Sequence, residues 1–268
     1  MLRETEYEKL TIQNSFIFTK VMEDPHLLKE LLRRILPGLP EGEMYIVKKE
    51  RTTDPFTRPF GIRALVFTED DKHLFSVEIL MGDRKNLRKQ ARYCQALADM
   101  ESNLSVSECG KLKDQYIIFI CPFDPFDGNM LLYTVRNICH ETGKELGDGT
   151  TKIFINCTGE NSDEYPLLKP FADYVMGIMS DDAYTAEVDR SVRMARKNPL
   201  WRKEYMDIRE LQAEAKREGR QEGRAEGLAE GIRDTSVTML KNMMEAGFSY
   251  EDACRILKLD EEEFRSLV

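Results

Sequence analysis

One segment, residues 61–81, constrains the fold of this chain most, because it predicts a β-hairpin with a buried face. Two β-rich runs, 62–68 and 74–81, flank a polar cluster at 69–73. Such runs on either side of a polar turn are typical of two antiparallel strands. Alternate positions form one apolar face, which we expect to lie in a core: Ile62, Ala64, Val66, Phe75, Val77, Ile79 and Met81. Any chemistry in the hairpin is therefore expected on the opposite face.

The register of the two strands decides which side chains meet on that second face. A turn centred near residues 71 and 72 places Leu65 opposite Glu78 and Arg63 opposite Leu80. The predicted face therefore carries one carboxylate, Glu78, beside two leucines.

Helices and strands are predicted on both sides of the hairpin. Apolar residues at helical spacing predict two helices between residues 14 and 36, separated at Asp24-Pro25. A further helix is expected from Arg84 to Ser102, and helices dominate from Glu164 onward. Strands are expected at 43–50, 116–121, 130–138 and 153–157. These elements predict an α/β fold.

Composition limits the class of protein. At 268 residues, the chain can hold one medium domain with a substantial core and an appendage. It contains no apolar run of about eighteen residues and no apolar signal region, so we expect a cytoplasmic protein without a membrane span. The net charge of −9 argues against nucleic-acid affinity over the whole surface, although a local basic patch is compatible with it. The six cysteines are scattered and are expected to be buried thiols rather than zinc ligands.

Several stretches in a fixed order carry a resemblance to a known family. They are LTIQNSFIFTKVMEDPHLLKELLRRILP, GIRALV, VEIL, RKQARYCQALADM, QYIIFICPFDPFDG, LGDGTTKIFIN, RKNPLWRKEYM and a tail of EGR repeats. With these, nearly the whole chain resembles the PD-(D/E)XK nuclease-like transposase family, also called recombination-promoting nucleases. The resemblance implies a restriction-endonuclease-like core, with a mixed sheet flanked by helices, and a C-terminal helical extension. It also implies DNA as a partner and Mg²⁺ as the cofactor of active relatives.

The chain departs from the family pattern at most positions that carry catalysis. The resemblance implies an aspartate after Asn14, where this chain has Ser15. The family hairpin reads GIRLDV and E-M-Q, and its Asp, Glu and Gln form the metal and catalytic set. Here Leu65 stands at the aspartate position and Leu80 at the glutamine position. Only Glu78 remains of the set.

This loss has a direct chemical consequence. In this fold class, phosphodiester hydrolysis needs Mg²⁺ held by about two carboxylates together with backbone oxygens and waters. Glu78 beside two leucines offers too few oxygen ligands, so we expect no cofactor and no bound metal. The alternative role for Glu78 is an ion pair with Arg63 on the same face. The carboxylates at 69–71 lie in the turn, ~13–20 Å away along the strand.

The predicted helix at 84–102 carries cations on successive turns. They are Arg84, Lys85, Arg88, Lys89 and Arg92. The family resemblance places this helix beside the substrate groove, which makes these side chains the best candidates for phosphate contacts. The alternative is a solvated helix face that binds nothing.

A four-residue repeat in the last third of the chain predicts self-association. It consists of Gly219, Gly223, Gly227 and Gly231, each preceded by a glutamate, and two of these glycines are followed by an arginine. On a helix, the glycines form a slowly drifting row between a glutamate row and a partial basic row. Glycines weaken an isolated helix but let two helices approach closely, so residues 210–234 are expected to mediate oligomerisation. The alternative is a flexible, solvated linker.

These patterns divide the chain into three segments. We expect a nuclease-like domain at 1–180, a helical region with the glycine arm at 181–234, and a small helical module at 235–268. The module has a helix-turn-helix cadence with Ser249 as a helix cap. Its acidic residues at 260–263 argue against DNA recognition by this part.

Three functions are compatible with the sequence. The first is a catalytically degenerate member of the family that binds DNA, or that associates with an active relative through its arm. The second is an active Mg²⁺-dependent DNA endonuclease that promotes recombination with Glu78 and rearranged carboxylates. The third is a structural, oligomerising protein. The depleted site favours the first, because function resides in the site rather than in the fold.

Overall fold

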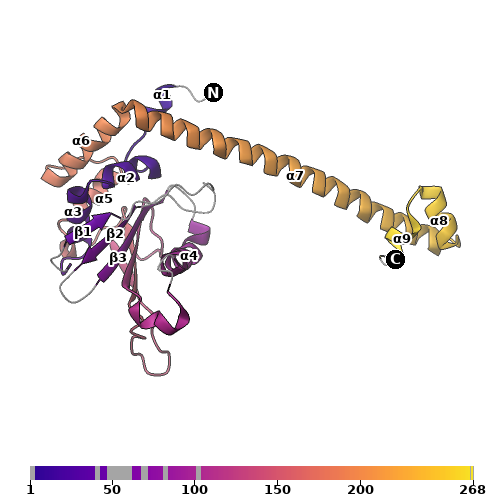
Figure 1. Cartoon of the computed structure of the whole chain (residues 1–268), viewed down its shortest axis with the longest axis horizontal. Helices are drawn as coiled ribbons and strands as arrows, with labels where there is room; N and C mark the ends of the chain where they lie inside the picture. Colours follow the sequence, from indigo (N-terminus) through magenta and orange to yellow (C-terminus); the bar gives the residue numbers. More distant parts are fainter. Residues whose placement is uncertain are drawn as a thin grey trace. The chain divides into compact units, whose positions relative to one another are not determined.

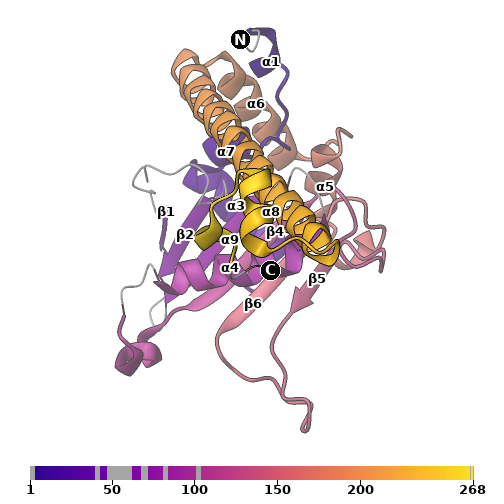
Figure 2. The same cartoon turned by 90° about the vertical axis from the view of Figure 1, so that its right-hand side faces the viewer.

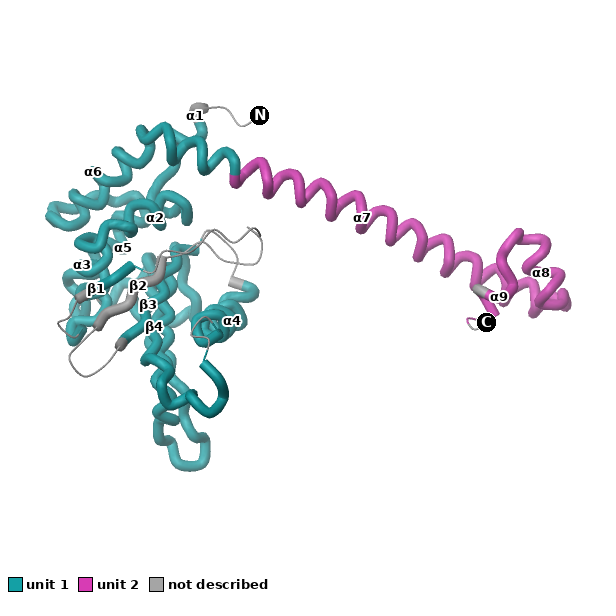
Figure 3. The backbone as a smooth tube through the Cα atoms, viewed as in Figure 1, with its two compact units in different colours: residues 1–207 teal, residues 208–268 magenta. Residues whose placement is uncertain are grey.

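The structure is a computed structural model of the whole chain. It describes residues 4–39, 43–46, 62–67, 72–80, 84–100, 104–265 and 267. The chain divides into two compact units, residues 1–207 and 208–268 (Figure 3).

A mixed β-sheet forms the centre of the first unit (Figure 1). Its six strands within the described ranges are β1 (Glu43–Ile46), β2 (Ile62–Phe67), β3 (Lys72–Ile79), β4 (Asp114–Cys121), β5 (Leu132–Val135) and β6 (Thr150–Asn156). The strand order is β1-β2-β3-β4-β6-β5, so β1 is an edge strand, and Figure 2 shows β5 and β6 toward the other edge. The central strands β3, β4 and β6 are parallel, and the remaining pairs are antiparallel. The predicted α/β class with a mixed sheet flanked by helices is confirmed at this level.

The predicted hairpin forms, but its predicted register was wrong. Leu65 of β2 lies opposite Leu74, and not opposite Glu78. The two strands are joined at residues 68–71, which lie outside the described residues, and the hairpin is centred two residues earlier than predicted. The reason is that the polar Lys72 and His73 belong to β3 instead of the turn, where strand pairing satisfies their backbone groups.

The register shift is an even number of residues, so every position keeps its predicted face. Arg63 lies opposite Ser76 and not opposite Leu80, yet it is still a diagonal neighbour of Glu78. The side chains of β2 lie outside the described residues, so the ion pair between Arg63 and Glu78 stays a prediction.

A layer of helices lies on one side of the sheet (Figure 1). It consists of α2 (Ser15–Met22), α3 (Pro25–Ile35), α5 (Lys169–Val175) and α6 (Ala183–Lys197), with the short α1 (Glu4–Tyr7) and the 3₁₀ turn η3 (Ser162–Glu164) in the same unit. The apolar face of β3 is fully buried at Phe75 and Val77, as predicted. The predicted break between the first two helices is confirmed, because the Asp24 side chain accepts a hydrogen bond from the His26 amide and Pro25 opens α3.

A buried ion pair ties α3 to α6. The Arg34 guanidinium, on a side chain only 7% exposed, donates from Nη2 to Asp182 Oδ1 at 3.0 Å and from Nη1 to Asp182 Oδ2 at 3.1 Å. Its Nε donates to Glu30 Oε1 at 3.1 Å, and the group lies 4.5 Å from the centroid of the Tyr184 ring. Asp182 also caps α6 by accepting from the Thr185 amide at 2.8 Å. These contacts lie within the first unit, which includes α6.

The other side of the sheet is covered by α4 (Leu87–Met100), which follows the 3₁₀ turn η1 (Arg84–Asn86) and connects the parallel strands β3 and β4 (Figure 1). Its buried residues form a single stripe: Leu87, Ala91, Cys94 and Ala98. The first three pack in one cluster with Ile117, Phe119, Cys121 and Phe154 of the sheet. The helix predicted from 84 to 102 is thus present over 84–100, and residues 101–103 lie outside the described ranges.

The cysteines are buried at four positions, as predicted: Cys94, Cys121, Cys157 and Cys254. Burial raises the pKa of the Cys121 thiol to about 12. The prediction was wrong for Cys109, which is exposed in the 3₁₀ turn η2 (Val106–Lys111), and for Cys139, which is half-buried in the loop after β5.

The second unit consists of most of α7 (Pro199–Glu245), α8 (Tyr250–Leu257) and α9 (Glu261–Phe264). Ser249 caps α8 by accepting from the Asp252 amide, as predicted. A small core forms around Leu240 and Cys254. The helix α7 continues past the expected segment boundary at Asp234 to Glu245, because the stretch after Asp234 contains no helix breaker until Gly247, where φ is +94°.

Candidate functional site

Glu78 lies beneath α4 and is almost fully buried. It is a β3 residue with 6% of its surface exposed, and in the parallel register it lies beside Phe119 of the apolar cluster. The Cys94 thiol of α4 donates to Glu78 Oε1 at 3.5 Å. The face of the hairpin on which chemistry was expected is therefore a second buried face, covered by a helix.

The residues around Glu78 do not fit a divalent ion. Leu80 packs against the apolar cluster under α4 and offers no ligand. Leu65 lies opposite Leu74, which precedes Glu78 by four residues on β3. The two positions are therefore ~13 Å apart along the strand. Ser15 is the half-buried first residue of α2, at a helix start capped by the Asn14 side chain.

Among the described residues, no carboxylates from elsewhere in the chain complete this set. The acidic residues at 69–71 lie outside the described residues, and β3 begins at Lys72, ~20 Å along the strand from Glu78. Within the described part of the chain, no three His, Cys, Asp or Glu side chains gather into a possible metal site. Mg²⁺ prefers a shell of oxygen ligands in octahedral geometry, and one buried carboxylate among hydrocarbon side chains does not provide it.

The side of α4 that faces away from the sheet is basic. Arg88, Lys89 and Arg92 of α4 are exposed, and so is Lys85 in the preceding turn η1. Their spacing of i, i+3, i+4 and i+7 places them near one face. At 100° per residue, the centre of this face lies about 140° around the helix axis from the buried stripe. The sequence has no acidic residue between positions 84 and 98, so the face is locally cationic in a chain with a net charge of −9. The side chain of Arg84, the fifth predicted cation, lies outside the described residues.

The loop between β4 and β5 supports one of these cations. The guanidinium carbon of Arg88 lies 5.2 Å from the centroid of the Phe126 ring, which is a cation–π contact. Asp124 orders this loop: it accepts hydrogen bonds from the backbone amides of Phe126 at 3.0 Å and Asn129 at 2.7 Å, and from the Tyr133 hydroxyl at 2.8 Å. Burial raises the pKa of Asp124, but these hydrogen bonds outweigh burial and hold it below its ordinary value.

A polar network that the sequence did not reveal holds α4 on the sheet. Gln95 Nε2 donates to Thr150 Oγ1 at 3.0 Å, and Gln115 Nε2 donates to Asp99 Oδ1 at 2.6 Å. Burial raises the pKa of the Asp99 carboxyl, the Gln115 hydrogen bond lowers it, and the nearby charge of Asp148 raises it again, so the net shift is upward. The sequence offered one indication of this network: Gln95 and Asp99 lie four residues apart on the predicted helix and therefore share a side of it. Together these bonds fix how α4 is rotated, and with it the direction of the cations.

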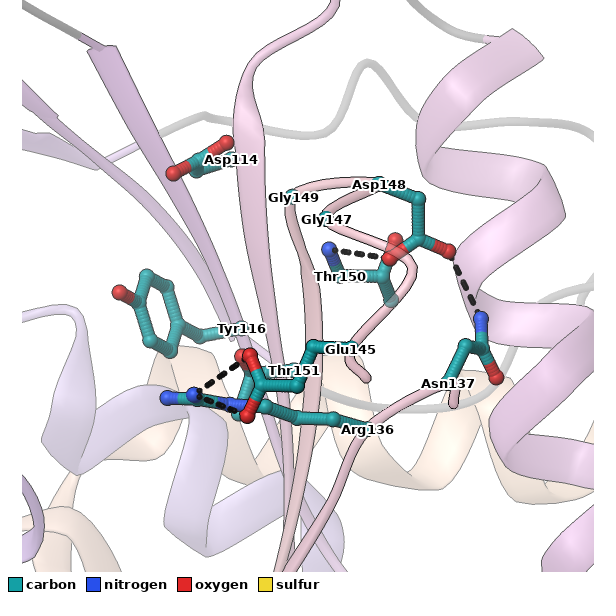
Figure 4. Close-up of a pocket in the computed structure, with 10 residues that line it drawn as sticks. All are labelled: Asp114, Tyr116, Arg136, Asn137, Glu145, Gly147, Asp148, Gly149, Thr150 and Thr151. Atoms are coloured by element: carbon teal, nitrogen blue, oxygen red, sulfur yellow. Dashed lines mark hydrogen bonds and ion pairs between the residues drawn. The ribbon is translucent and has the colours of Figure 1, made fainter. Parts of the chain in front are cut away.

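A pocket of about 290 Å³ lies at the N-terminal ends of β4 and β6 (Figure 4). Residues that line it include Asp114, Tyr116, Arg136, Glu145, Asp148 and Thr151. Two of its charged groups form an ion pair, with Arg136 Nη1 3.0 Å from Glu145 Oε1. The Asp148 carboxylate instead accepts a hydrogen bond from the neutral Asn137 side chain, Nδ2 to Oδ2, at 2.7 Å. The pocket is at the end of the parallel strands remote from Glu78, roughly 13 Å along β3, so the two do not form one site.

No helix in the described ranges has both the length and the apolar character needed to cross a bilayer. Compared with protein-family models, curated proteins and solved structures, the chain matches none. The resemblance to the nuclease-like family therefore rests on the sequence motifs alone.

Proposed function

We propose that this chain is a catalytically degenerate relative of the PD-(D/E)XK nuclease-like transposases that binds DNA through α4. The mixed sheet, with a hairpin followed by a helical crossover to a parallel strand, is compatible with a restriction-endonuclease-like core. The relation itself is supported by the ordered motifs from LTIQNSF to the EGR repeats.

The observation that carries the proposal is the basic face of α4. Lys85, Arg88, Lys89 and Arg92 extend over about 10 Å of helix, a length in which duplex DNA presents about six phosphate charges. Arg88 is oriented by Phe126, and α4 is fixed by its polar contacts to the sheet. A cationic face held in one direction by packing loses less conformational entropy on binding a phosphate backbone than free side chains do.

The same arrangement argues against cleavage by this chain. A phosphate bound on the outer face of α4 is separated from Glu78 by the helix itself, which has a diameter of about 10 Å with its side chains. Hydrolysis requires the phosphate, the ion and the activated water to meet at the carboxylates. Here the remaining carboxylate accepts a hydrogen bond from the Cys94 thiol and lies beside Phe119 of the apolar cluster in the strand register.

Binding to fluorescent duplex DNA, followed by anisotropy at low salt, tests the proposal. The diagnostic variant is Lys89→Gln/Arg92→Gln, which avoids Arg88 because that residue also contacts Phe126. Its matched control is Arg190→Gln/Lys197→Gln, which removes the same charge from exposed positions of α6. We expect the α4 variant to bind about tenfold or more weakly, and the control to bind as the wild type does. Equal losses in both variants, or no binding by the wild type, would reject α4 as the DNA-binding surface.

A supercoiled-plasmid assay with Mg²⁺ or Mn²⁺ tests the degenerate site separately. We expect no more nicking by the wild type than by Glu78→Gln. Nicking by the wild type that a chelator and Glu78→Gln both abolish would instead support a metal-dependent endonuclease.

A further inference from the structure

Residues 216–235 of α7 form a stretch of helix in which every residue is exposed. The stretch contains Gly219, Gly223, Gly227 and Gly231, and nothing beyond the helix's own nearby backbone lies within 4 Å of the position that a Cβ would take at any of them. Glycine is the poorest helix former apart from proline, and helices in proteins are stabilised mainly by packing one face. Within the described residues this stretch has no such packing.

The charges of the stretch are arranged in rows. Acidic residues occupy every fourth position at Glu210, Glu214, Glu218, Glu222, Glu226, Glu230 and Asp234, and a shorter basic row consists of Lys216, Arg220 and Arg224. Each glutamate from Glu218 onward precedes a glycine, and both arginines follow one. The two rows therefore lie about 100° to either side of the glycine row.

Within one helix these rows do not neutralise each other. Between these two rows the nearest acidic and basic side chains are two residues apart, as in Glu218 and Arg220, and side chains at that spacing do not face one another. Within residues 210–234 the favourable i,i+3 spacing occurs at the two ends only, where Arg217 follows Glu214 and Arg233 follows Glu230. In the part of the chain that the structure describes, no charged side chain between residues 208 and 245 forms an ion pair. Each acidic residue instead repels the next one four positions along. Along residues 218–226 the charge pattern is thus unfavourable in a single helix.

A second copy of the same helix can bring opposite charges together in one of two orientations. If two helices face each other through their glycine rows and run parallel, a two-fold axis along the pair places the acidic flank of each against the basic flank of the other. In an antiparallel pair, the two-fold axis crosses the helices and brings acidic against acidic and basic against basic. Flanking charges of this kind set partner orientation in paired helices. The charge pattern therefore selects the parallel pair.

The glycine row supplies the matching contact. Glycines at every fourth residue lie along the i±4 ridge of a helix, and their missing side chains allow two backbones to approach closely at a right-handed crossing. Leu228 and Ile232 continue the line of the basic row and are 66% and 58% exposed. These apolar side chains lie beside the glycines and would lose water contact in a pair.

We propose that two copies of this chain pair in parallel through residues 215–231 of α7, with their glycine rows in contact and acidic flanks against basic flanks. The pairing is independent of DNA binding and of any residual activity at Glu78.

The mass of the full-length chain in sedimentation equilibrium tests the pairing. We expect a dimer in the wild type and a monomer at the same concentration in Gly223→Leu/Gly227→Leu, whose bulk separates the backbones. Leucine is a better helix former than glycine, so circular dichroism should show no loss of helix that would explain the dissociation. The matched control is Gln221→Leu/Ala225→Leu on the opposite side of the helix, which we expect to remain dimeric. A wild type that stays monomeric up to about 100 μM, where a pair with a Kd of that order would be substantially formed, overturns the proposal.

A charge exchange tests the orientation. The variants Glu218→Arg/Glu222→Arg and Arg220→Glu/Arg224→Glu make both flanks of one helix alike. In a parallel pair, each variant alone should dimerise about tenfold or more weakly than the wild type at low salt, and an equal mixture of the two should recover a heterodimer. In an antiparallel pair, like flanks already meet in the wild type, so each variant alone would dimerise as well as the wild type does. That second result would overturn the parallel arrangement.

Discussion

Replacing Asp182 by alanine removes the carboxylate that holds Arg34 and, in the same step, the cap of α6. The two bonds between the carboxylate and the guanidinium are 3.0 and 3.1 Å long, and the Arg34 side chain is only 7% exposed. Removing one partner of a buried ion pair costs about 3–5 kcal/mol, and losing a helix cap costs about 1 kcal/mol. Because Glu30 still holds Nε of Arg34, the guanidinium is not left without a charged partner, and the expected loss lies below the sum of these costs, at about 3 kcal/mol for both effects together.

Asparagine at the same position separates the two effects. Asp182→Asn keeps a side-chain oxygen for the Thr185 amide, so it should preserve the cap while removing the charge. We expect Asp182→Asn to be less destabilising than Asp182→Ala by about 1 kcal/mol. The exposed pair of Arg136 and Glu145 supplies the control, and Glu145→Ala should change stability by less than about 1 kcal/mol.

Urea unfolding measures these losses. The only tryptophan, Trp201, belongs to the first unit and reports on its unfolding by fluorescence. A loss of about 3 kcal/mol moves the urea midpoint by roughly 1 M or more for a slope of about 2–3 kcal/mol/M. An alanine variant that unfolds at the wild-type midpoint, or a Glu145→Ala control that loses as much, would refute the role given to this buried pair.

The difference in unfolding free energy between the wild type and Asp182→Ala depends on pH, and its direction follows from the pKa of Asp182. Burial raises the pKa of Asp182, but the hydrogen bonds from Thr185 and the contact with Arg34 outweigh burial and lower it in the folded chain. The stabilisation is therefore fully present above the unfolded-state pKa and is lost as the pH falls through the folded-state pKa. The gap between the wild type and Asp182→Ala should narrow in acid.

Three further perturbations have expected outcomes. Gly159→Ala should destabilise the first unit by about 1–3 kcal/mol in urea, because a Cβ there would collide with backbone at the start of β5, whereas Gly110→Ala has open space and should change little. Burial raises the folded-state pKa of Asp99, so ionisation of this carboxyl destabilises the folded wild type as the pH rises through the carboxyl range. Asp99→Asn cannot ionise there and should become more stable relative to the wild type over the same range; a pH-independent difference would contradict this. A thiol reagent should modify Cys109 in the native chain well before the buried cysteines, which mass spectrometry of the labelled peptides can show.

Local sequence patterns predicted which side of a strand or helix each residue lies on better than they predicted which residues pair across strands. Alternation in the hairpin assigned Phe75 and Val77 to the core, because the side-chain period of a strand is two whatever its partner. The pairing of Leu65 with Leu74 was missed, since register depends on where the turn falls and the turn is a run of polar residues with no unique centre. The cationic face of α4 was predicted for a similar reason, because helical spacing fixes which side chains share a side.

Contacts between residues far apart in sequence were not predictable. The burial of Glu78 depends on α4 lying across β3, and the thiol that contacts it, Cys94, was expected only to be a buried apolar group. Within the first unit, Arg34 reaches Asp182, 148 positions along the chain. Arg34 lies in one predicted helix and Asp182 precedes another, and no sequence pattern indicated that their side chains meet.

The sharpest test of DNA binding through α4 is the slope of the logarithm of duplex affinity against the logarithm of salt concentration. Each phosphate contact contributes about −0.9 to this slope, so contacts by Lys85, Arg88, Lys89 and Arg92 predict about −3.6 for the wild type. Lys89→Gln/Arg92→Gln should flatten the slope by about 1.8, while the control on α6 leaves it unchanged. A wild-type slope near zero, or a slope that the α4 variant does not alter, would contradict the proposed DNA-binding surface.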